Sequence, residues 1–299
     1  MNRTTRRTWL KSTAVGAGVL TTTPAINAAG DESFKATGKN IKQSVMGWCF
    51  KSKPNPVSNE DLAKHCAAMG MKAMEGVSTK TYPLIKKLGM DIALTGSHGF
   101  KNGPSDPKNH EMCEKKLREG IDRAVEFDCK SVITFTGMKV KGMDDEEGFK
   151  NCVDLWKKVI GYAEKKKVNL CLEHLNSRDD THPMKGHPGY LGDDVDQCAK
   201  LIEQVGSPNM KLLFDIYHVQ IMNGDVIRRI RQYKDIIGHY HTAGNPGRAE
   251  LDDTQEINYP PIMRAIVETG YKGFVAQEFI PTWEDKIKAL RHAMKLCDV

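Results

Sequence analysis

Four residues that can bind a metal ion or move a proton stand at the ends of successive apolar runs. They are Glu173 after NLCL, Asp215 after LLF, His241 in HYH and Glu278 after VAQ, and they are 42, 26 and 37 residues apart. A charged side chain in such a place is costly to bury without a partner. Three carboxylates and one imidazole suit a divalent cation such as Mg²⁺, Mn²⁺ or Co²⁺, with Zn²⁺ as a further option. The pattern therefore predicts one divalent-metal site.

The elements that must position these residues alternate between strand and helix. Eight short runs, rich in apolar and β-branched residues, predict parallel strands buried on both faces. These runs cover 43–50, 72–77, 90–96, 131–137, 168–175, 210–217, 236–243 and 273–279. Helical patterns are expected from 58, near 80–88, and over 109–127, 145–166, 192–205, 224–233, 259–269 and 283–297.

This alternation predicts an α/β fold, a single (β/α)8 TIM barrel over residues 41–299. In such a barrel the active site lies at the C-terminal ends of the strands, where the four residues are expected. A doubly wound open sheet is the main alternative. It usually binds phosphate at a Gly-rich first turn, and the sequence has no such turn.

Several stretches resemble the hydroxypyruvate isomerase family, which lies within the xylose-isomerase-like sugar isomerase and epimerase barrels. They are LEHLN (172–176), HPGYL (187–191), FDIYHVQIMNGD (214–225), GHYHTAGNPGR (238–248), EINYPPI (256–262) and GYKGFVAQEFIP (270–281). The similarity runs from about residue 41 to the end of the chain. It implies a metal-dependent isomerase or epimerase that acts on a small sugar or keto-acid.

The resemblance also assigns roles to residues. It implies that Glu173, Asp215, His241 and Glu278 are the metal ligands, that Glu173 and Glu278 are also the catalytic acid/base pair, and that His218 and Arg248 contact substrate oxygens. His241 departs from many hydroxypyruvate isomerases, which have Gln there, and agrees with ketose 3-epimerases. His174 stands where Pro is commoner.

The reaction class follows from the residue types. Isomerisation and epimerisation both remove a proton next to a carbonyl, and a divalent ion stabilises the negative charge that then develops on oxygen. Two carboxylates on opposite faces of the substrate can take and return the proton. Weaker candidates for substrate binding are Glu75 and His98, at the ends of the second and third strands, and His187 in HPGYL.

The basic excess of the chain lies at its N-terminus. The formal charge is +6, and Arg3, Arg6, Arg7 and Lys11 account for four of these charges, which leaves +2 for the remainder. Residues 1–28 read as a twin-arginine-type signal peptide and 29–40 as a polar lead-in. We therefore expect export, to the periplasm in the simplest case, with no membrane anchor after the signal is removed. The small remaining charge gives no support for nucleic-acid binding.

Three other functions use the same residues. They are a lyase or epimerase for keto-sugars, a hydrolase that resembles the AP endonucleases, and a non-catalytic sugar-binding protein. The hydrolase needs several metal ions and more histidines, whereas a carboxylate-rich centre is an unusual way to bind neutral sugar. A homo-oligomer is a further expectation, because barrels of this group often pair. The eight cysteines are scattered singly, which indicates core residues and no zinc site.

Overall fold

The computed structural model describes residues 33–299. The predicted signal peptide at 1–28 and the start of the lead-in lie outside the described residues, so export stays a prediction. In the part that is described, no helix has both the length and the apolar character needed to cross a membrane.

Eight parallel strands form a closed ring in the described chain. They are β1 (Lys42–Val45), β2 (Ala73–Met74), β3 (Asp91–Ile92), β4 (Ser131–Thr134), β5 (Asn169–Glu173), β6 (Met210–Asp215), β7 (Ile237–Thr242) and β8 (Phe274–Gln277). Six of them pair in the order β1-β8-β7-β6-β5-β4, and β2 pairs with β3. Single bridges from Met46 to Glu75 and from Thr95 to Val132 join the two sheets. The predicted (β/α)8 barrel is confirmed.

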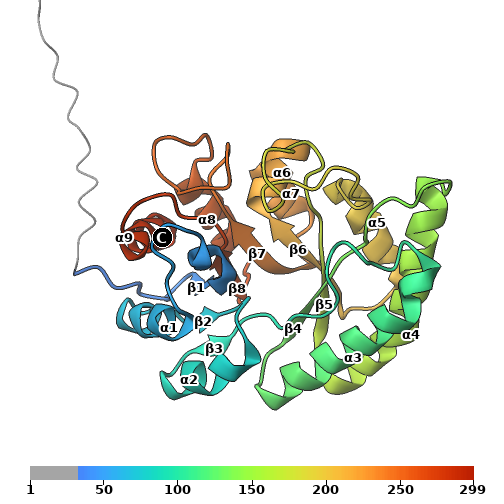
Figure 1. The fold of residues 1–299 in the computed structure, drawn as a ribbon, viewed down its shortest axis with the longest axis horizontal. Helices are drawn as coiled ribbons and strands as arrows, with labels where there is room; N and C mark the ends of the chain where they lie inside the picture. Colours follow the sequence, from blue (N-terminus) through green and yellow to red (C-terminus); the bar gives the residue numbers. More distant parts are fainter. Residues whose placement is uncertain (1–32) are drawn as a thin grey trace, which may run out of the picture.

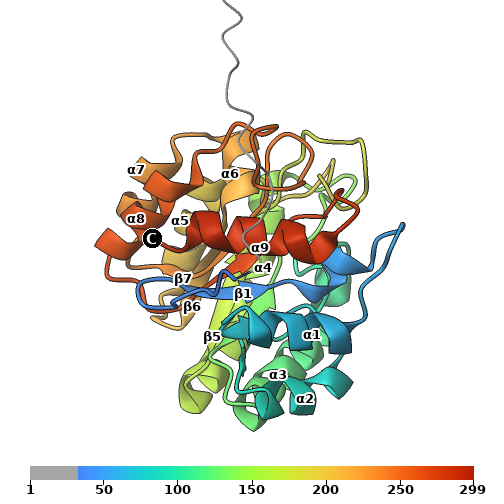
Figure 2. The ribbon, with the colours of Figure 1, turned by 90° about the vertical axis from the view of Figure 1, so that its left-hand side faces the viewer.

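Helices surround this ring (Figure 1). They are α1 (Asn59–Ala68), α2 (Tyr82–Lys87), α3 (His110–Glu126), α4 (Asp145–Lys166), α5 (Val195–Val205), α6 (Ile216–Met222), α7 (Val226–Gln232), α8 (Tyr259–Glu268) and α9 (Lys286–Cys297), with short 3₁₀ helices η1 (Gly47–Lys51), η2 (Thr79–Thr81) and η3 (Pro107–Asn109). The last helix, α9, lies beside β1 in both views (Figure 2). There the Gln43 side chain donates a hydrogen bond to the carbonyl of Met294 at 2.9 Å.

Capping side chains decide where several helices begin. Ser58, Asp144, Asp194 and Asp285 each accept a hydrogen bond from a backbone N–H three residues later. Such a bond satisfies one of the N–H groups that the first turn of a helix leaves without a partner. This is why α5 begins after Asp194, three residues later than its apolar pattern predicts.

All eight predicted strands end earlier than expected, and two of them show why. The run 43–50 stops being a strand at Val45, and Gly47–Lys51 is a 3₁₀ helix. Gly47 lies so close to the segment after β2 that a Cβ there would be 2.2 Å from Val77 Cγ1. The run 210–217 ends at Asp215, because its carboxylate accepts from the N–H groups of Tyr217 and His218 and so starts α6.

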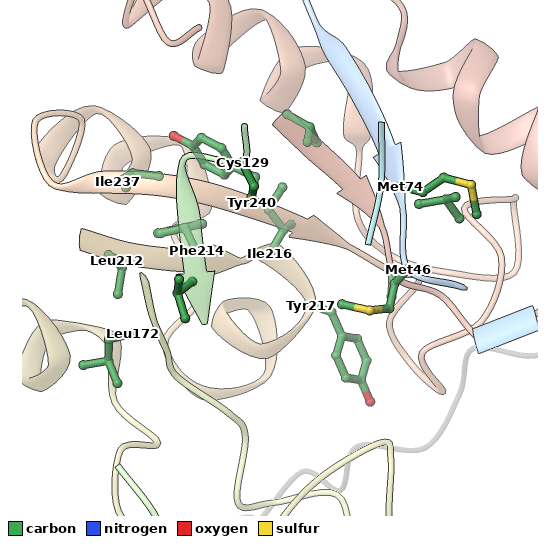
Figure 3. Packing of buried hydrophobic residues seen from close by; sticks show 14 of the residues in the cluster. Met46, Met74, Cys129, Leu172, Leu212, Phe214, Ile216, Tyr217, Ile237 and Tyr240 are labelled. Atoms are coloured by element: carbon green, nitrogen blue, oxygen red, sulfur yellow. The ribbon is translucent and has the colours of Figure 1, made fainter. Parts of the chain in front are cut away.

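Alternation along the strands separates the barrel interior from the layer under the helices. Leu172, Phe214 and Tyr240 belong to the large apolar core, and the rings of Phe214 and Tyr240 are 5.8 Å apart (Figure 3). Cys171 and Leu213 form a small separate cluster with Leu94. Because side chains two residues apart share a face of a strand, Glu173 and Asp215 point into the barrel above Cys171 and Leu213. All eight cysteines are buried and free.

Trp156→Ala should lower the free energy of unfolding by about 3–5 kcal/mol, measured by urea denaturation. The side chain is fully buried on α4, and its indole N–H donates to Thr134 Oγ1 on β4 at 3.0 Å. The substitution leaves a cavity and removes one of the two side-chain hydrogen-bond partners of the Thr134 hydroxyl, the other being His98. The neighbouring exposed Lys157→Ala serves as control and should change stability by less than about 0.5 kcal/mol. A similar small change for Trp156→Ala would contradict this packing.

Candidate metal centre

The structure brings Glu173, Asp215, His241 and Glu278 together inside the barrel. One possible ligand atom from each lies within 4.8 Å of those of the others, and all four residues are buried. His241 Nδ1 is 3.0 Å from Glu173 Oε1 and 2.6 Å from Glu278 Oε2. These residues are 68 and 37 positions from His241 in the chain. Their role as ligands stays a prediction, but their convergence is a feature of the fold.

Strand register explains this convergence. Glu173 and Asp215 are the last residues of β5 and β6, and Asp215 is paired directly with His241 on β7. Glu278 follows the last residue of β8, and its N–H donates to the carbonyl of Thr242 at 2.9 Å. All four side chains therefore lie at the C-terminal ends of parallel strands, which is the end of the barrel where barrel enzymes have their active sites.

The donor set fits a divalent cation. Asp215 Oδ1 accepts two backbone hydrogen bonds, whereas its Oδ2 is buried with no hydrogen-bond partner. Three carboxylates contribute −3 and the nearby guanidinium of Arg248 contributes +1, which leaves −2. One divalent ion neutralises this charge. Oxygen ligands with one imidazole favour Mg²⁺, Mn²⁺ or Co²⁺ and also admit Zn²⁺.

Arg248 reaches the four residues from the loop after β7. Its Nη2 lies 2.6 Å from Glu278 Oε2 and 3.8 Å from Asp215 Oδ2, and the side chain is only 2% exposed. Its Nη1 donates to the carbonyl of Met184, in the loop after β5. The guanidinium also lies over the ring of Trp48, 5.6 Å from the centroid. Arg248 thus links two loops above the centre and faces the same space as the carboxylates.

His218 lies on α6 beside the centre, and its contact with substrate stays a prediction. Its Nδ1 accepts the N–H of Asn176 at 3.0 Å, so the ring proton is on Nε2. Nε2 faces Asp215 Oδ2 at 3.5 Å and is buried with no hydrogen-bond partner. Burial, with the nearby Arg248 charge, holds the pKa of His218 well below its usual value. His218 is therefore a neutral N–H donor.

The ionisable groups perturb one another strongly. Burial and the Glu278 carboxylate raise the pKa of Asp215 to about 7, and the same causes raise the pKa of Glu173. Burial acts to raise the pKa of Glu278 too, but Arg248 and His241 outweigh it and hold that pKa at about 2. Burial opposes ionisation of His241, yet the surrounding carboxylates raise its pKa. A cation in this place would supply the positive charge that the His241 proton otherwise provides.

Glu75 lies under His241, away from the space that Arg248 faces. Its carboxylate is 2.8 Å from His241 Nε2 and 2.9 Å from His239 Nε2, and it accepts from Ser44 Oγ at 3.0 Å. These contacts use its oxygens within the barrel, so they favour a supporting role over the predicted contact with substrate. His239 was missed as a site residue. The signal that could have found it is its spacing of two from His241, which puts both rings inside the barrel.

His98 and His187 lie at the rim. His98 Nε2 is 3.0 Å from Thr134 Oγ1, and burial lowers the pKa of His98 to about 4. The ring of His187 lies 4.3 Å from that of Phe100 and 6.1 Å from that of His218. His187 is therefore nearer to the candidate substrate space, while His98 is bonded to β4. Substrate contact by either residue stays a prediction.

The barrel agrees with one known family. Residues 64–297 match the model described as "Xylose isomerase-like TIM barrel", and the chain belongs to this family. The resemblance noted from the motifs is thereby confirmed.

Among its curated relatives are the putative hydroxypyruvate isomerase of Homo sapiens and the hydroxypyruvate isomerase of Escherichia coli K12. The human protein is 31% identical over 60% of this chain and 68% of its own length. The E. coli protein is 30% identical over 56% of this chain and 64% of its own length. A solved structure of 3-keto-D-glucoside 4-epimerase from E. coli superimposes with a TM-score of 0.70 at 14% identity, over 86% of this chain and 98% of that one. Hydroxypyruvate isomerases are thus among the relatives of this chain, and the epimerase shares its fold.

Proposed function

We propose that the chain is a divalent-metal-dependent isomerase or epimerase of a small sugar or keto-acid. The observation that carries this proposal is that carboxylate oxygens of both Glu173 and Glu278 lie next to the His241 Nδ1 atom, at 3.0 and 2.6 Å. Two carboxylates next to one ion-binding point are what proton transfer beside a carbonyl requires. The hydroxypyruvate isomerases among its relatives support the same reaction class.

In this proposal the residues of the centre have separate roles. Glu173, Asp215, His241 and Glu278 would hold a divalent cation, which would supply electrophilic stabilisation of the charge that develops on substrate oxygens. Glu278, kept ionised by Arg248, removes the proton next to the carbonyl, and Glu173 returns one on the other face or at the neighbouring atom. Arg248 and His218 Nε2–H orient the substrate oxygens as hydrogen-bond donors.

His241 favours a ketose over hydroxypyruvate as the substrate, because His at this position is the pattern of ketose 3-epimerases. The charge balance agrees. Three carboxylates, one guanidinium and one divalent ion sum to zero, and the Glu75 carboxylate beneath adds −1, so a neutral sugar suits this site better than an anionic keto-acid. A lyase or epimerase for keto-sugars is the second candidate, since it uses the same abstraction of a proton.

The test is exchange of solvent deuterium into candidate substrates. The purified protein is incubated with Mn²⁺ in D₂O with a panel of ketoses, keto-sugars and hydroxypyruvate, and the products are analysed by NMR. Deuterium at the terminal carbon of a ketose indicates an aldose–ketose isomerase, whereas deuterium at the inner carbon beside the carbonyl indicates an epimerase. Exchange accompanied by loss of a substituent indicates a lyase. Failure to exchange with every member of the panel would contradict the proposal and favour hydrolysis or simple sugar binding.

A further inference from the structure

A second buried cluster lies directly beneath the candidate metal centre. It consists of Glu75, His239 and His241, whose possible ligand atoms also lie within 4.8 Å of one another. Ser44 on β1 completes it with a hydrogen bond to Glu75. His241 belongs to both clusters, because one ring nitrogen faces each of them. A change at Glu75 should therefore alter the orientation of the His241 ring and the direction of its other nitrogen.

The Glu75 carboxylate is fully enclosed by the barrel. It is 0% exposed, as is Ser44, and His239 is 1% exposed. Removing an ionised carboxylate from water costs several kcal/mol unless partners replace the water. Here a hydroxyl and two imidazoles do so, at 3.0, 2.9 and 2.8 Å from the carboxylate oxygens. An apolar residue would fill this layer of the barrel without that cost, so a buried acid here calls for a role.

The geometry fixes the orientation of the His241 ring. Nε2 lies 2.8 Å from Glu75 Oε1, which accepts hydrogen bonds in this cluster, so Nε2 carries a hydrogen. Nδ1 is then the nitrogen that remains for an ion, and it faces Glu173 and Glu278. Metal-bound histidines commonly donate their second N–H to a carboxylate, which fixes the ring and makes the binding nitrogen a stronger ligand.

We propose that Glu75 is a positioning residue that holds the His241 ring, with Nδ1 directed at the metal centre. This inference rests on the proposed metal-dependent function. His239 in turn anchors Glu75 from below. It lines a cavity of about 450 Å³ at the N-terminal end of the barrel, together with Tyr271 and Lys211, and so separates the carboxylate from that opening.

The test measures metal binding directly. Isothermal titration calorimetry with Mn²⁺ alone compares the wild-type protein with Glu75→Gln, which keeps the side-chain shape and removes the charge. We expect the dissociation constant of the variant to rise about 10–100-fold. The visible absorption of bound Co²⁺ gives a second readout. At saturating Co²⁺ its bands should shift in Glu75→Gln, because the direction of one ligand changes.

Ser44→Ala is the matched control. It removes the third donor to the same carboxylate without touching His241, so it perturbs the cluster but should change Mn²⁺ affinity less than about threefold. If Glu75 only filled the barrel, both variants would change stability and neither would change affinity. An unchanged Mn²⁺ affinity and Co²⁺ spectrum in Glu75→Gln would therefore overturn the inference.

Other outcomes separate the inference from the function on which it rests. If Glu75→Gln does not fold, Glu75→Asp retracts the carboxylate by one methylene, and full metal affinity in that variant would equally overturn the inference. Binding of two Mn²⁺ ions per wild-type chain, with one lost in Glu75→Gln, would make Glu75 a ligand instead. Absence of Mn²⁺ binding to the wild-type protein would overturn the proposed metal centre itself, and the inference with it.

Discussion

Glu278→Gln is expected to lower the rate of deuterium exchange into the substrate by about 1,000-fold or more, within the range that general acid–base groups contribute. The amide cannot accept the proton, although it keeps the size of the side chain. The loss should appear in the turnover number, because the ground-state contacts of the substrate with Arg248 and His218 remain. Exchange followed by NMR at saturating substrate and Mn²⁺ measures this effect.

Glu173→Gln should produce a loss of similar size, since one carboxylate serves each face of the substrate. Glu250→Gln is the matched control. Glu250 is also a buried glutamate, 2% exposed, but it accepts hydrogen bonds from the N–H groups of Thr282 and Trp283, outside the cluster of four. Exchange at the wild-type rate in either Glu173→Gln or Glu278→Gln would rule out the two-carboxylate mechanism.

Removal of the divalent ion by a chelator should abolish exchange, and added Mn²⁺ should restore it. Without an ion, three buried carboxylates face one guanidinium, and Asp215 Oδ2 has no hydrogen-bond partner. The ion should also stabilise the fold, by about 2.7 kcal/mol when its free concentration is 100 times its dissociation constant. Thermal unfolding with and without Mn²⁺ measures this second effect.

Asp215→Asn tests whether the two effects of the ion have the same origin. It removes one ligand charge while Arg248 and both glutamates stay in place, so both the Mn²⁺-dependent exchange and the Mn²⁺-dependent stabilisation should fall together. Exchange that persists in the presence of a strong chelator, after the ion has been shown to be absent, would disprove the metal-dependent reaction.

Much of this fold and site could be predicted from the sequence. The alternation of apolar runs with helical patterns was enough to predict the barrel, because parallel strands buried on both faces are near-continuous runs of apolar residues. The convergence of Glu173, Asp215, His241 and Glu278 followed from their places at strand ends. Both conclusions depend on local patterns and on the general geometry of the barrel.

The parts that could not be predicted depend on contacts between distant segments. Strand β2 is only Ala73–Met74, because the chain turns at Gly76, where a Cβ would lie 1.9 Å from Met46 Sδ. The contact of Glu75 with His241 joins residues 166 positions apart, and no local pattern indicates it. Arg248 was expected near the substrate, but its link to Met184 depends on how two loops meet above the barrel.

The reactivity of the eight buried thiols can be used to measure local unfolding of the protein. Burial raises the pKa of each of them, for example that of Cys113 to about 12, so the folded chain presents almost no thiolate. An alkylating reagent can then reach sulfur only when part of the barrel transiently unfolds. The order in which Cys49, Cys113 and Cys297 become labelled would rank the opening of η1, α3 and α9 without any introduced probe.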